Sequence, residues 1–265
     1  MSGELMKVLR ILFRFAVARL AQPIGPKANL ILHPKGEFIS DQIRSTGRHY
    51  EIERLIWVKN NLDYSGFVDV GANIGNHSNF FLGLGSTVSA FEPARENFKL
   101  LELNCPGAEC HNIALSDMET MAELITFPSA MGNSALAGFQ GSKTSRKQPS
   151  SSSEIVRTKR LDSFHIPHPT LIKVDVEGSE FSVLKGAQKT LERHKPSLWV
   201  EIHNPKIRHS EDWRNRESSV LDWLSSLGYR LVTVLGKVDN ILVHEGKIGR
   251  TSGSSRYLNS QRDCR

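Results

Sequence analysis

Short apolar runs alternate with helical patterns along the middle of the chain. Runs rich in Val, Ile, Leu and Phe predict buried strands at Gly66–Val70, Thr87–Phe91, Glu109–Asn112 and Ser197–Ile202, with another beginning at Leu171. Between them, apolar residues recur at helical spacing, which predicts helices at Asn76–Leu84, at Ala94–Asn104 and from a Ser179 cap to the residue before Pro196. This alternation predicts an α/β fold: a mostly parallel sheet with helices on both faces.

The C-terminal part predicts a different pairing. A helical pattern at Glu217–Leu227 precedes two apolar runs, Tyr229–Leu235 and Ile241–His244, joined by a short turn around Gly236. Because so short a connection cannot cross over, we expect these two strands to be antiparallel. Two extra strands are expected earlier in the chain, at Ala122–Phe127 and Glu154–Lys159.

The length of 265 residues suits one α/β domain with appendages. We place the domain at residues 62–248 and a helical cover segment before it at 1–61. Within that segment, the helical pattern of Ile39–Asn61 predicts a lid or cover helix. The stretch 138–153 is dense in Ser, Gly, Lys and Gln, so it predicts a flexible insert. Residues 249–265 predict a disordered tail.

The first residues form an apolar stretch, Leu5–Leu20, interrupted by basic residues such as Lys7, Arg10 and Arg14. No uncharged span reaches bilayer length, so this is not a transmembrane helix. The basic stripe is compatible with peripheral contact to an anionic membrane. The alternative, which we favour, is a helix docked on the protein's own core or on a dimer partner, because wide apolar stripes usually face a core.

Composition narrows the partners and the compartment. The formal charge of +6 is spread along the chain without interleaved aromatic residues, so nucleic acid is not the expected partner. The three cysteines, Cys105, Cys110 and Cys264, form no C-x-x-C pair and leave one unpaired. A disulfide framework or a zinc site is therefore not expected, and a reducing cytoplasmic location is favoured.

A glycine-spaced turn follows the first predicted strand. Asp69 ends the apolar run, and Gly71, Asn73 and Gly75 follow at alternate positions before the helix begins. Glycines let the backbone approach a ligand, and the helix directs free N–H groups toward it. Because Asn73 stands where a dinucleotide fingerprint has its middle glycine, the loop suits S-adenosylmethionine better than a pyrophosphate. Glu92, about twenty residues further on, has the position of an acid that binds ribose hydroxyls.

Polar side chains stand at the ends of four predicted strands. Besides Asp69 and Glu92, the later strands end on Asp175 with Glu177 and on Glu201 with His203. Parallel sheets bind ligands at the carboxyl ends of their strands, so we expect these groups to converge on one crevice. Asn112 and Asp117 can also reach an adenine edge, although both residue types favour turns for local reasons.

Several of these stretches together resemble the FkbM family of S-adenosylmethionine-dependent methyltransferases. The resemblance covers about Gly66–His203 and is carried by Val68–Gly75, Phe91–Pro93, Asn112–Asp117, Thr158–Phe164, Ile172–Gly178 and Val200–His203. It implies the class I methyltransferase fold, a Rossmann-like seven-stranded sheet whose last strand is antiparallel. It also implies methylation of a hydroxyl oxygen on a small molecule, sugar or lipid-linked glycan.

The resemblance also implies roles for individual residues. Asp69, Gly71, Asn73 and Gly75 would surround the methionine part of the cofactor, and Asp175 would lie beside the sulfonium. Glu92 would bind the ribose, and Asn112 would lie near the adenine.

Methyl transfer to a hydroxyl requires alignment and removal of a proton. Glu177, Glu201 and His203 are the candidate bases. A divalent metal near Asp175 is a second possibility that the sequence leaves open, and no metal ligand set is assigned. Two other classes also remain open: a nicotinamide-dependent oxidoreductase, and a non-catalytic binding module on a methyltransferase fold.

Overall fold

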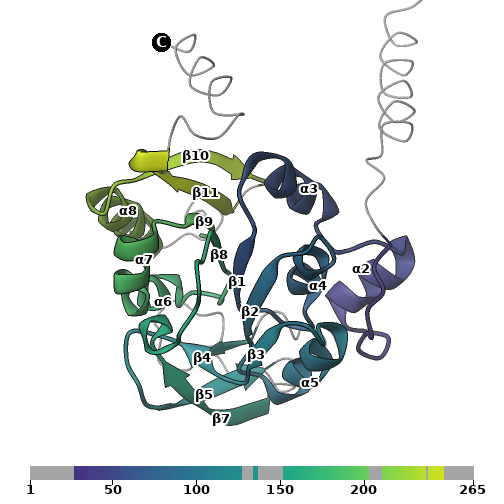
Figure 1. The fold of residues 1–265 in the computed structure, drawn as a ribbon. Coiled ribbons are helices and arrows are strands. Elements are labelled where there is room, and N and C mark those ends of the chain that lie inside the picture. Colours follow the sequence, from purple (N-terminus) through teal and green to yellow (C-terminus); the bar gives the residue numbers. More distant parts are fainter. Residues whose placement is uncertain (1–26, 127–133, 137–151, 203–210, 237, 248–265) are drawn as a thin grey trace, which may run out of the picture.

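The computed structural model describes residues 27–126, 134–136, 152–202, 211–236 and 238–247. Its centre is a seven-stranded sheet with the strand order β10-β11-β9-β8-β1-β2-β3 (Figure 1). The strands of this sheet are β1 (Gly66–Val70), β2 (Thr87–Phe91), β3 (Glu109–His111), β8 (Leu171–Val174), β9 (Ser197–Glu201), β10 (Tyr229–Leu235) and β11 (Asp239–His244).

Five neighbouring strands of the sheet, β9, β8, β1, β2 and β3, are parallel. Their carboxyl ends therefore open on the same edge, as the sequence predicts. At the other side, β11 lies between β9 and β10 and is antiparallel to both. The prediction of a class I methyltransferase sheet with an antiparallel last strand is confirmed.

Helices cover both faces of the sheet (Figure 1). One face carries α3 (Ile52–Asn61), α4 (Asn76–Leu82) and α5 (Arg95–Asn104), and the other carries α6 (Glu180–Gly186), α7 (Gln188–His194) and α8 (Glu211–Ser226). Successive β1 side chains serve the two faces, since Phe67 packs into one apolar core and Val68 into the other. The near-continuous apolar strands follow from this two-sided burial.

A smaller, four-stranded sheet has the order β4-β7-β5-β6. It contains the two extra strands expected from the sequence, which the structure describes as β5 (Met121–Thr126) and β7 (Ser152–Lys159) and pairs antiparallel. The short strands β4 (Ala114–Leu115) and β6 (Ala135–Leu136) complete it. An apolar cluster that includes Leu124 and Leu136 packs this sheet against Ala94, at the start of α5.

The single helical pattern expected over Ile39–Asn61 is wrong in detail. The structure has two helices there, α2 (Phe38–Thr46) and α3. Helix α2 ends at Gly47, and Glu51 precedes α3, both in the left-handed region with φ values of 66° and 58°. A left-handed residue cannot continue a right-handed helix, so the chain turns between them. Leu55 of α3 is fully buried in the core, which makes α3 part of the domain's packing.

The helix expected after Ser179 is also divided. Ala187 lies outside helical geometry between α6 and α7, and the Ser179 side chain makes no capping hydrogen bond. The end of α6 lies close to the backbone of Ser116. A Cβ on Gly186 would lie 2.1 Å from the carbonyl oxygen of Ser116, so only a glycine permits this approach. Helix α8 begins at Glu211, earlier than the predicted Glu217.

Several predictions concern residues outside the described ranges. These are the N-terminal helix, the tail and most of the Ser-rich insert at 138–153. Within the described residues, no helix is both long enough and apolar enough to cross a membrane. The division of the chain into a cover segment, a domain and a tail stays a prediction.

Candidate functional site

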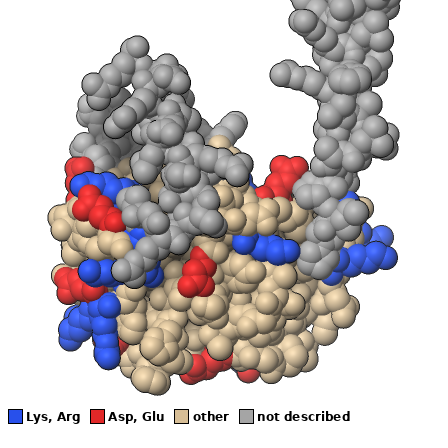
Figure 2. Space-filling view, turned by 45° about the horizontal axis from the view of Figure 1, so that its top comes forward, with Lys and Arg blue, Asp and Glu red and all other residues tan. Residues whose placement is uncertain are grey.

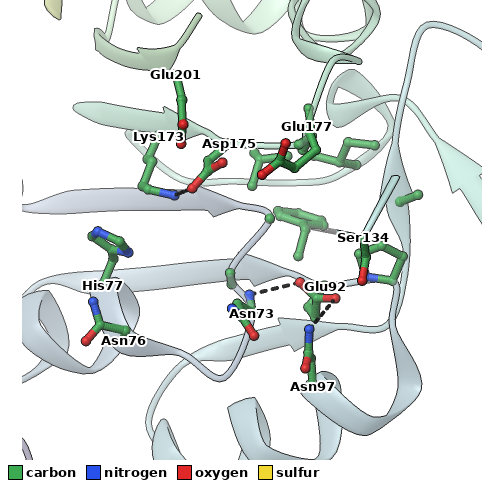
Figure 3. Close-up of a pocket in the computed structure, with 18 of the residues that line it drawn as sticks. Asn73, Asn76, His77, Glu92, Asn97, Ser134, Lys173, Asp175, Glu177 and Glu201 are labelled. Carbon is green, nitrogen blue, oxygen red and sulfur yellow. Dashed lines mark hydrogen bonds and ion pairs between the residues drawn. The ribbon is translucent and has the colours of Figure 1, made fainter. Parts of the chain in front are cut away.

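A cavity of about 340 Å³ opens at the carboxyl ends of the parallel strands. Four of its walls come from the sites that the sequence predicts: the loop after β1, Glu92 after β2, the loop after β8, and Glu201 at the end of β9. Figure 3 shows Lys173, Asp175, Glu177 and Glu201 on one side, with Asn73 and Glu92 facing them. The volume of the cavity is in the range of small-molecule sites.

The loop after β1 needs a glycine for close packing. Gly71 has a φ of 79°, and a Cβ there would lie 1.9 Å from the carbonyl oxygen of Asp175, so no side chain fits. The N–H groups of Gly71 and Ala72 both donate to the carbonyl oxygen of Phe91, each at 3.0 Å, which joins the loop to β2. Asn73 has a φ of 51°. Asparagine tolerates this left-handed conformation better than most residues, so Asn73 takes up a glycine-like backbone.

Glu92 connects this loop to the next helix. One carboxylate oxygen accepts the N–H of Asn73 at 2.9 Å, and the other accepts the N–H of Ala94 at 2.9 Å. Burial raises the pKa of Glu92 to about 7, although these two N–H donors oppose the rise. Glu92 therefore titrates near neutral pH at the wall of the cavity.

Three predicted cofactor residues are not part of the cavity wall. Asp69 is fully buried, and its Oδ2 accepts the hydroxyl of Ser78 at 2.7 Å. A Cβ on Gly75 would lie 2.8 Å from Cys105 Sγ, so that glycine serves packing. The amide of Asn112 donates to the carbonyl oxygens of Glu92 and Pro93, each at 2.9 Å. None of these three predicted residues lines the cavity, so their direct contact with a cofactor stays a prediction.

A buried lysine that sequence analysis missed organises the acids on the other side. Lys173, only 2% exposed, lies with its Nζ 2.9 Å from Asp175 Oδ2 and 3.9 Å from Asp69 Oδ1. Burial is the largest influence and would raise the pKa of Asp175, but Lys173 and a hydrogen bond with Glu201 together outweigh it, so the pKa is lowered. A lysine in the middle of an apolar strand was the available signal, because lysine is almost never fully buried unless paired.

Glu201 shares a side-chain hydrogen bond with Asp175. Burial raises the pKa of Glu201, and the Asp175 carboxylate raises it further. The pair therefore holds its proton on Glu201 and its negative charge on Asp175, which faces Lys173. Two carboxyl groups in contact favour such a shared proton.

Of the other two predicted bases, Glu177 lies within the described residues and His203 does not. Glu177 lines the cavity and has a φ of 53°, so it is a non-glycine residue in the left-handed region. Backbone strain of this kind is concentrated at functional sites. His203 lies outside the described residues. No group of three or more His, Cys, Asp or Glu side chains within the described ranges is placed to hold a metal ion.

The segment before β1 contributes residues that the helical pattern did not indicate. Tyr50, Glu51 and, from α4, His77 line the cavity beside Asn76. His77 Nε2 lies 3.4 Å from Glu51 Oε2, and the His77 ring packs edge-on against Trp199. Nothing local in the sequence marks these residues, because they meet only when α3 and α4 pack on the same face of the sheet.

Charges of both signs lie interspersed on the face of the molecule shown in Figure 2, around a broad uncharged area. A continuous basic surface, the usual footprint of nucleic-acid binding, is not seen among the described residues of that face.

The sheet order, the antiparallel β11 and a cavity beside the Gly71 loop define a class I methyltransferase fold. The family model described as "Methyltransferase FkbM domain" matches residues 69–231, more than half of the chain. The chain belongs to the FkbM methyltransferase family, and the resemblance found in the sequence is confirmed.

Two curated relatives match part of the chain. Hexuronic acid methyltransferase AglP of Haloferax volcanii is 34% identical over 139 residues, which cover 51% of this chain and 54% of the relative. Methyltransferase 1 of Beauveria bassiana is 31% identical over 148 residues, covering 47% of this chain and 59% of the relative. The match thus spans little more than half the length of either relative.

Solved structures with a similar fold include methyltransferase FkbM from Methylobacillus flagellatus, which is 20% identical with a TM-score of 0.44 and covers 67% of this chain and 42% of that chain. Another is the Pyrococcus abyssi tRNA (uracil-54, C5)-methyltransferase in complex with S-adenosyl-L-homocysteine. It is 14% identical with a TM-score of 0.45 and covers 82% of this chain and 42% of that chain.

Proposed function

We propose that this protein is an S-adenosylmethionine-dependent methyltransferase that transfers a methyl group to a hydroxyl oxygen. The observation that carries the proposal is the placement of Glu92, whose carboxylate lines the cavity while it holds the N–H of Asn73 in the Gly71 loop. A ribose-binding acid and a close-approach loop are thereby joined into one cofactor site. Family membership supports the same cofactor.

The polar atoms of the cavity fit this cofactor. Asn73 Oδ1 and Ser179 Oγ are buried and have no hydrogen-bond partner among the described residues, although both residues line the cavity. Unsatisfied buried polar groups are rare and need an explanation, which a bound ligand provides. Asp175 and Glu177 add negative charge suited to a sulfonium and an ammonium group.

The opposite end of the cavity is apolar. Ile113, Leu115, Leu124 and Leu136 line it, the last three from the small sheet. In the proposal this end receives the adenine, with Glu92 on the ribose and the Gly71–Asn73 loop on the methionine part. Asn112 supports the adenine end indirectly, because its amide fixes the carbonyl groups of Glu92 and Pro93.

The bound sulfonium supplies an activated methyl group, and the acceptor hydroxyl must lose its proton as it attacks. Of the three candidate bases, Glu177 lines the cavity. Glu201 also lines it, but its raised pKa keeps it protonated, which suits a hydrogen-bond donor better than a base. We therefore place Glu177 first, with His203 as the remaining candidate. A positioned base contributes about 10²–10⁴ in rate.

The proposed acceptor is a small molecule, a sugar or a lipid-linked glycan. One curated relative bears the name hexuronic acid methyltransferase, which supports a sugar acceptor. Charges of both signs are interspersed on the face shown in Figure 2, and nucleic acid is not the proposed partner. Contact of the N-terminal basic helix with a membrane, and a cytoplasmic location, stay predictions.

A nicotinamide-dependent oxidoreductase is the alternative that shares most of these features. It would also use a strand-end acid such as Glu92, but a pyrophosphate would need the space that the Asn73 side chain occupies. A non-catalytic binding module is the third class. The acids Asp175, Glu177 and Glu201 at the cavity favour the enzyme over this module.

Calorimetric titration with S-adenosylmethionine, S-adenosylhomocysteine and NADH tests the cofactor. We expect both sulfur compounds to bind and NADH not to bind; tight NADH binding with no response to S-adenosylhomocysteine would reject the proposal. Incubation of cell extracts with labelled S-adenosylmethionine, followed by mass spectrometry, then tests catalysis. One new O-methylated product is expected. Transfer to nitrogen or carbon alone would contradict the hydroxyl acceptor, and binding without any labelled product would favour the non-catalytic module.

A further inference from the structure

An exposed aromatic side chain stands at the mouth of the cavity. Phe38, at the start of α2, is 55% exposed although it lines the cavity. Its ring packs edge-on against Tyr50, with the centroids 6.1 Å apart. An exposed aromatic ring at a cavity mouth offers a flat apolar face to a ligand.

Tyr50 is held firmly in this position. Its N–H donates to Asn76 Oδ1 at 2.9 Å, and the Asn76 amide donates back to the Tyr50 carbonyl oxygen at 3.0 Å. Asn76 is the first residue of α4 and lines the same cavity. The turn before α3 is therefore tied directly to the helix that follows the cofactor loop.

Glu51, the next residue, carries a carboxylate to the cavity wall from a strained backbone. It makes no helix-capping hydrogen bond, and its carboxylate instead pairs with Arg54, which is also 2.6 Å from the buried Asp239. Although burial opposes it, the pKa of Glu51 is lowered by His77 and then by Arg54. Glu51 is thus an ionised acceptor of hydrogen bonds. Its left-handed backbone is strained, and such strain is concentrated at functional sites.

The Phe38, Tyr50 and Glu51 side chains all come from residues before position 69, where the family match begins. The matched region contains the Gly71 loop, Glu92 and Asp175, which serve the cofactor in the proposed function. In the proposed function, the matched region binds the cofactor. The segment before residue 69 is then available to contact the second substrate.

We propose that Phe38, Tyr50 and Glu51 form the acceptor-binding subsite. The Phe38 ring, supported edge-on by Tyr50, contacts one face of a ring in the acceptor, and the Glu51 carboxylate accepts a hydrogen bond from a hydroxyl on that ring. The acceptor is therefore a hydroxylated ring with an apolar face, as in a sugar or a phenol. This inference rests on the proposed function and assigns the substrate side of the same cavity.

The test uses the full-length protein, labelled S-adenosylmethionine, and the extract fraction that the wild-type protein methylates. Phe38→Ala and Glu51→Gln should each raise the KM for that fraction by about 10-fold or more, since a charge-assisted hydrogen bond or an aromatic contact is lost. The kcat should change far less than the KM, because these residues lie outside the chemical step. Phe38→Tyr should restore the KM.

Matched controls separate binding from folding. Leu103, on α5, is 61% exposed and does not line the cavity, so Leu103→Ala should leave the KM unchanged. Thermal melts check that Glu51→Gln remains folded after the change beside Arg54. Titration with S-adenosylhomocysteine should give the same Kd for every variant. A Kd that weakens as much as the KM rises would overturn the subsite, because these residues would then cover the cofactor.

The remaining outcomes distinguish the two levels of the proposal. If the wild-type protein methylates the fraction but Phe38→Ala and Glu51→Gln retain its KM, the subsite is wrong and the proposed function stands. If the wild-type protein binds S-adenosylhomocysteine but methylates nothing, the proposed function fails and the subsite fails with it. Periodate, which cleaves vicinal diols, should abolish acceptor activity for a sugar and spare it for a monohydric phenol. An acyclic methylated product would also overturn the subsite.

Discussion

Replacement of Lys173 by methionine tests how the acids of the cavity are held. The Nζ of Lys173 lies 2.9 Å from Asp175 and 3.9 Å from Asp69, and the Lys173 side chain is only 2% exposed. Methionine keeps most of the apolar volume of the lysine stem and removes the charge. The change therefore isolates the electrostatic contribution from the packing of β8 between its neighbours.

The expected loss of unfolding free energy follows from the burial of these groups. Removing one partner of a buried ion pair costs about 3–5 kcal/mol, because the other charge stays buried without compensation. The Asp175 side chain is 28% exposed, so water can stabilise part of its charge. We therefore expect a loss near the lower limit, about 3 kcal/mol at pH 8.

The loss should depend on pH with a defined sign. In the wild-type protein Lys173 keeps the pKa of Asp175 low. Without the lysine, burial should raise the pKa of Asp175 above its value in the unfolded chain, although the hydrogen bond from Glu201 opposes the rise, so the folded variant takes up a proton more readily. A group with a raised folded pKa stabilises at low pH and loses that contribution as the pH rises. The difference between wild type and variant should therefore be smaller at pH 5 than at pH 8.

Urea unfolding at pH 5 and pH 8, followed by circular dichroism, measures the loss of unfolding free energy and its dependence on pH. The comparison holds when the slope of the transition is the same in variant and wild type. Lys99→Met is the matched control, because Lys99 is exposed and pairs with Glu96 on the surface of α5. That exposed pair should contribute little. A loss below about 1 kcal/mol for Lys173→Met, the upper limit for exposed pairs, would refute the reasoning, as would an equal loss at both pH values.

Four further predictions concern Glu92, the Gly71 loop and the chemistry. Glu92→Ala should weaken S-adenosylhomocysteine binding by about 1.5–3 kcal/mol in calorimetry at pH 8, and an unchanged Kd would contradict a ribose contact. Because the pKa of Glu92 is about 7, wild-type affinity should rise from pH 6 to pH 8 as the carboxylate ionises, whereas Glu92→Gln should show no such rise. Gly71→Ala should lower the melting temperature far more than Gly85→Ala; both glycines have positive φ, but a Cβ clashes only at Gly71, so equal shifts would argue against the clash. Glu177→Gln should reduce turnover by about 10²–10⁴ at unchanged cofactor affinity, and full turnover would exclude Glu177 as the base.

Much of the fold and part of the site follow from local patterns. The apolar run ending at Asp69, with Gly71 and Gly75 after it, predicts a strand, a tight loop and a helix, because strand burial and the need for glycine are local properties of the chain. Glu92 could be placed by its distance from that loop and by the strand before it. The antiparallel β10–β11 pair followed in the same way from the short turn at Gly236.

The break between α2 and α3 shows where local patterns fail. Apolar spacing continues from Ile43 to Val58, so the pattern alone favours one helix. The left-handed conformation of Glu51 is unfavourable by itself. The Glu51 carboxylate pairs with Arg54 and lies near His77, and Arg54 also pairs with Asp239. These partners come from different parts of the chain.

The sequence by itself determined the alternation of strands and helices in the central sheet, the glycine-spaced loop after β1, and which acids stand at strand ends. Only the tertiary structure decided that Lys173 lies between Asp69 and Asp175, that Glu201 shares a proton with Asp175, and that Glu51 reaches the same cavity. The physical reason is that periodicity and turn chemistry act between neighbouring residues, whereas the charge state and burial of a side chain depend on groups that packing brings close from distant positions.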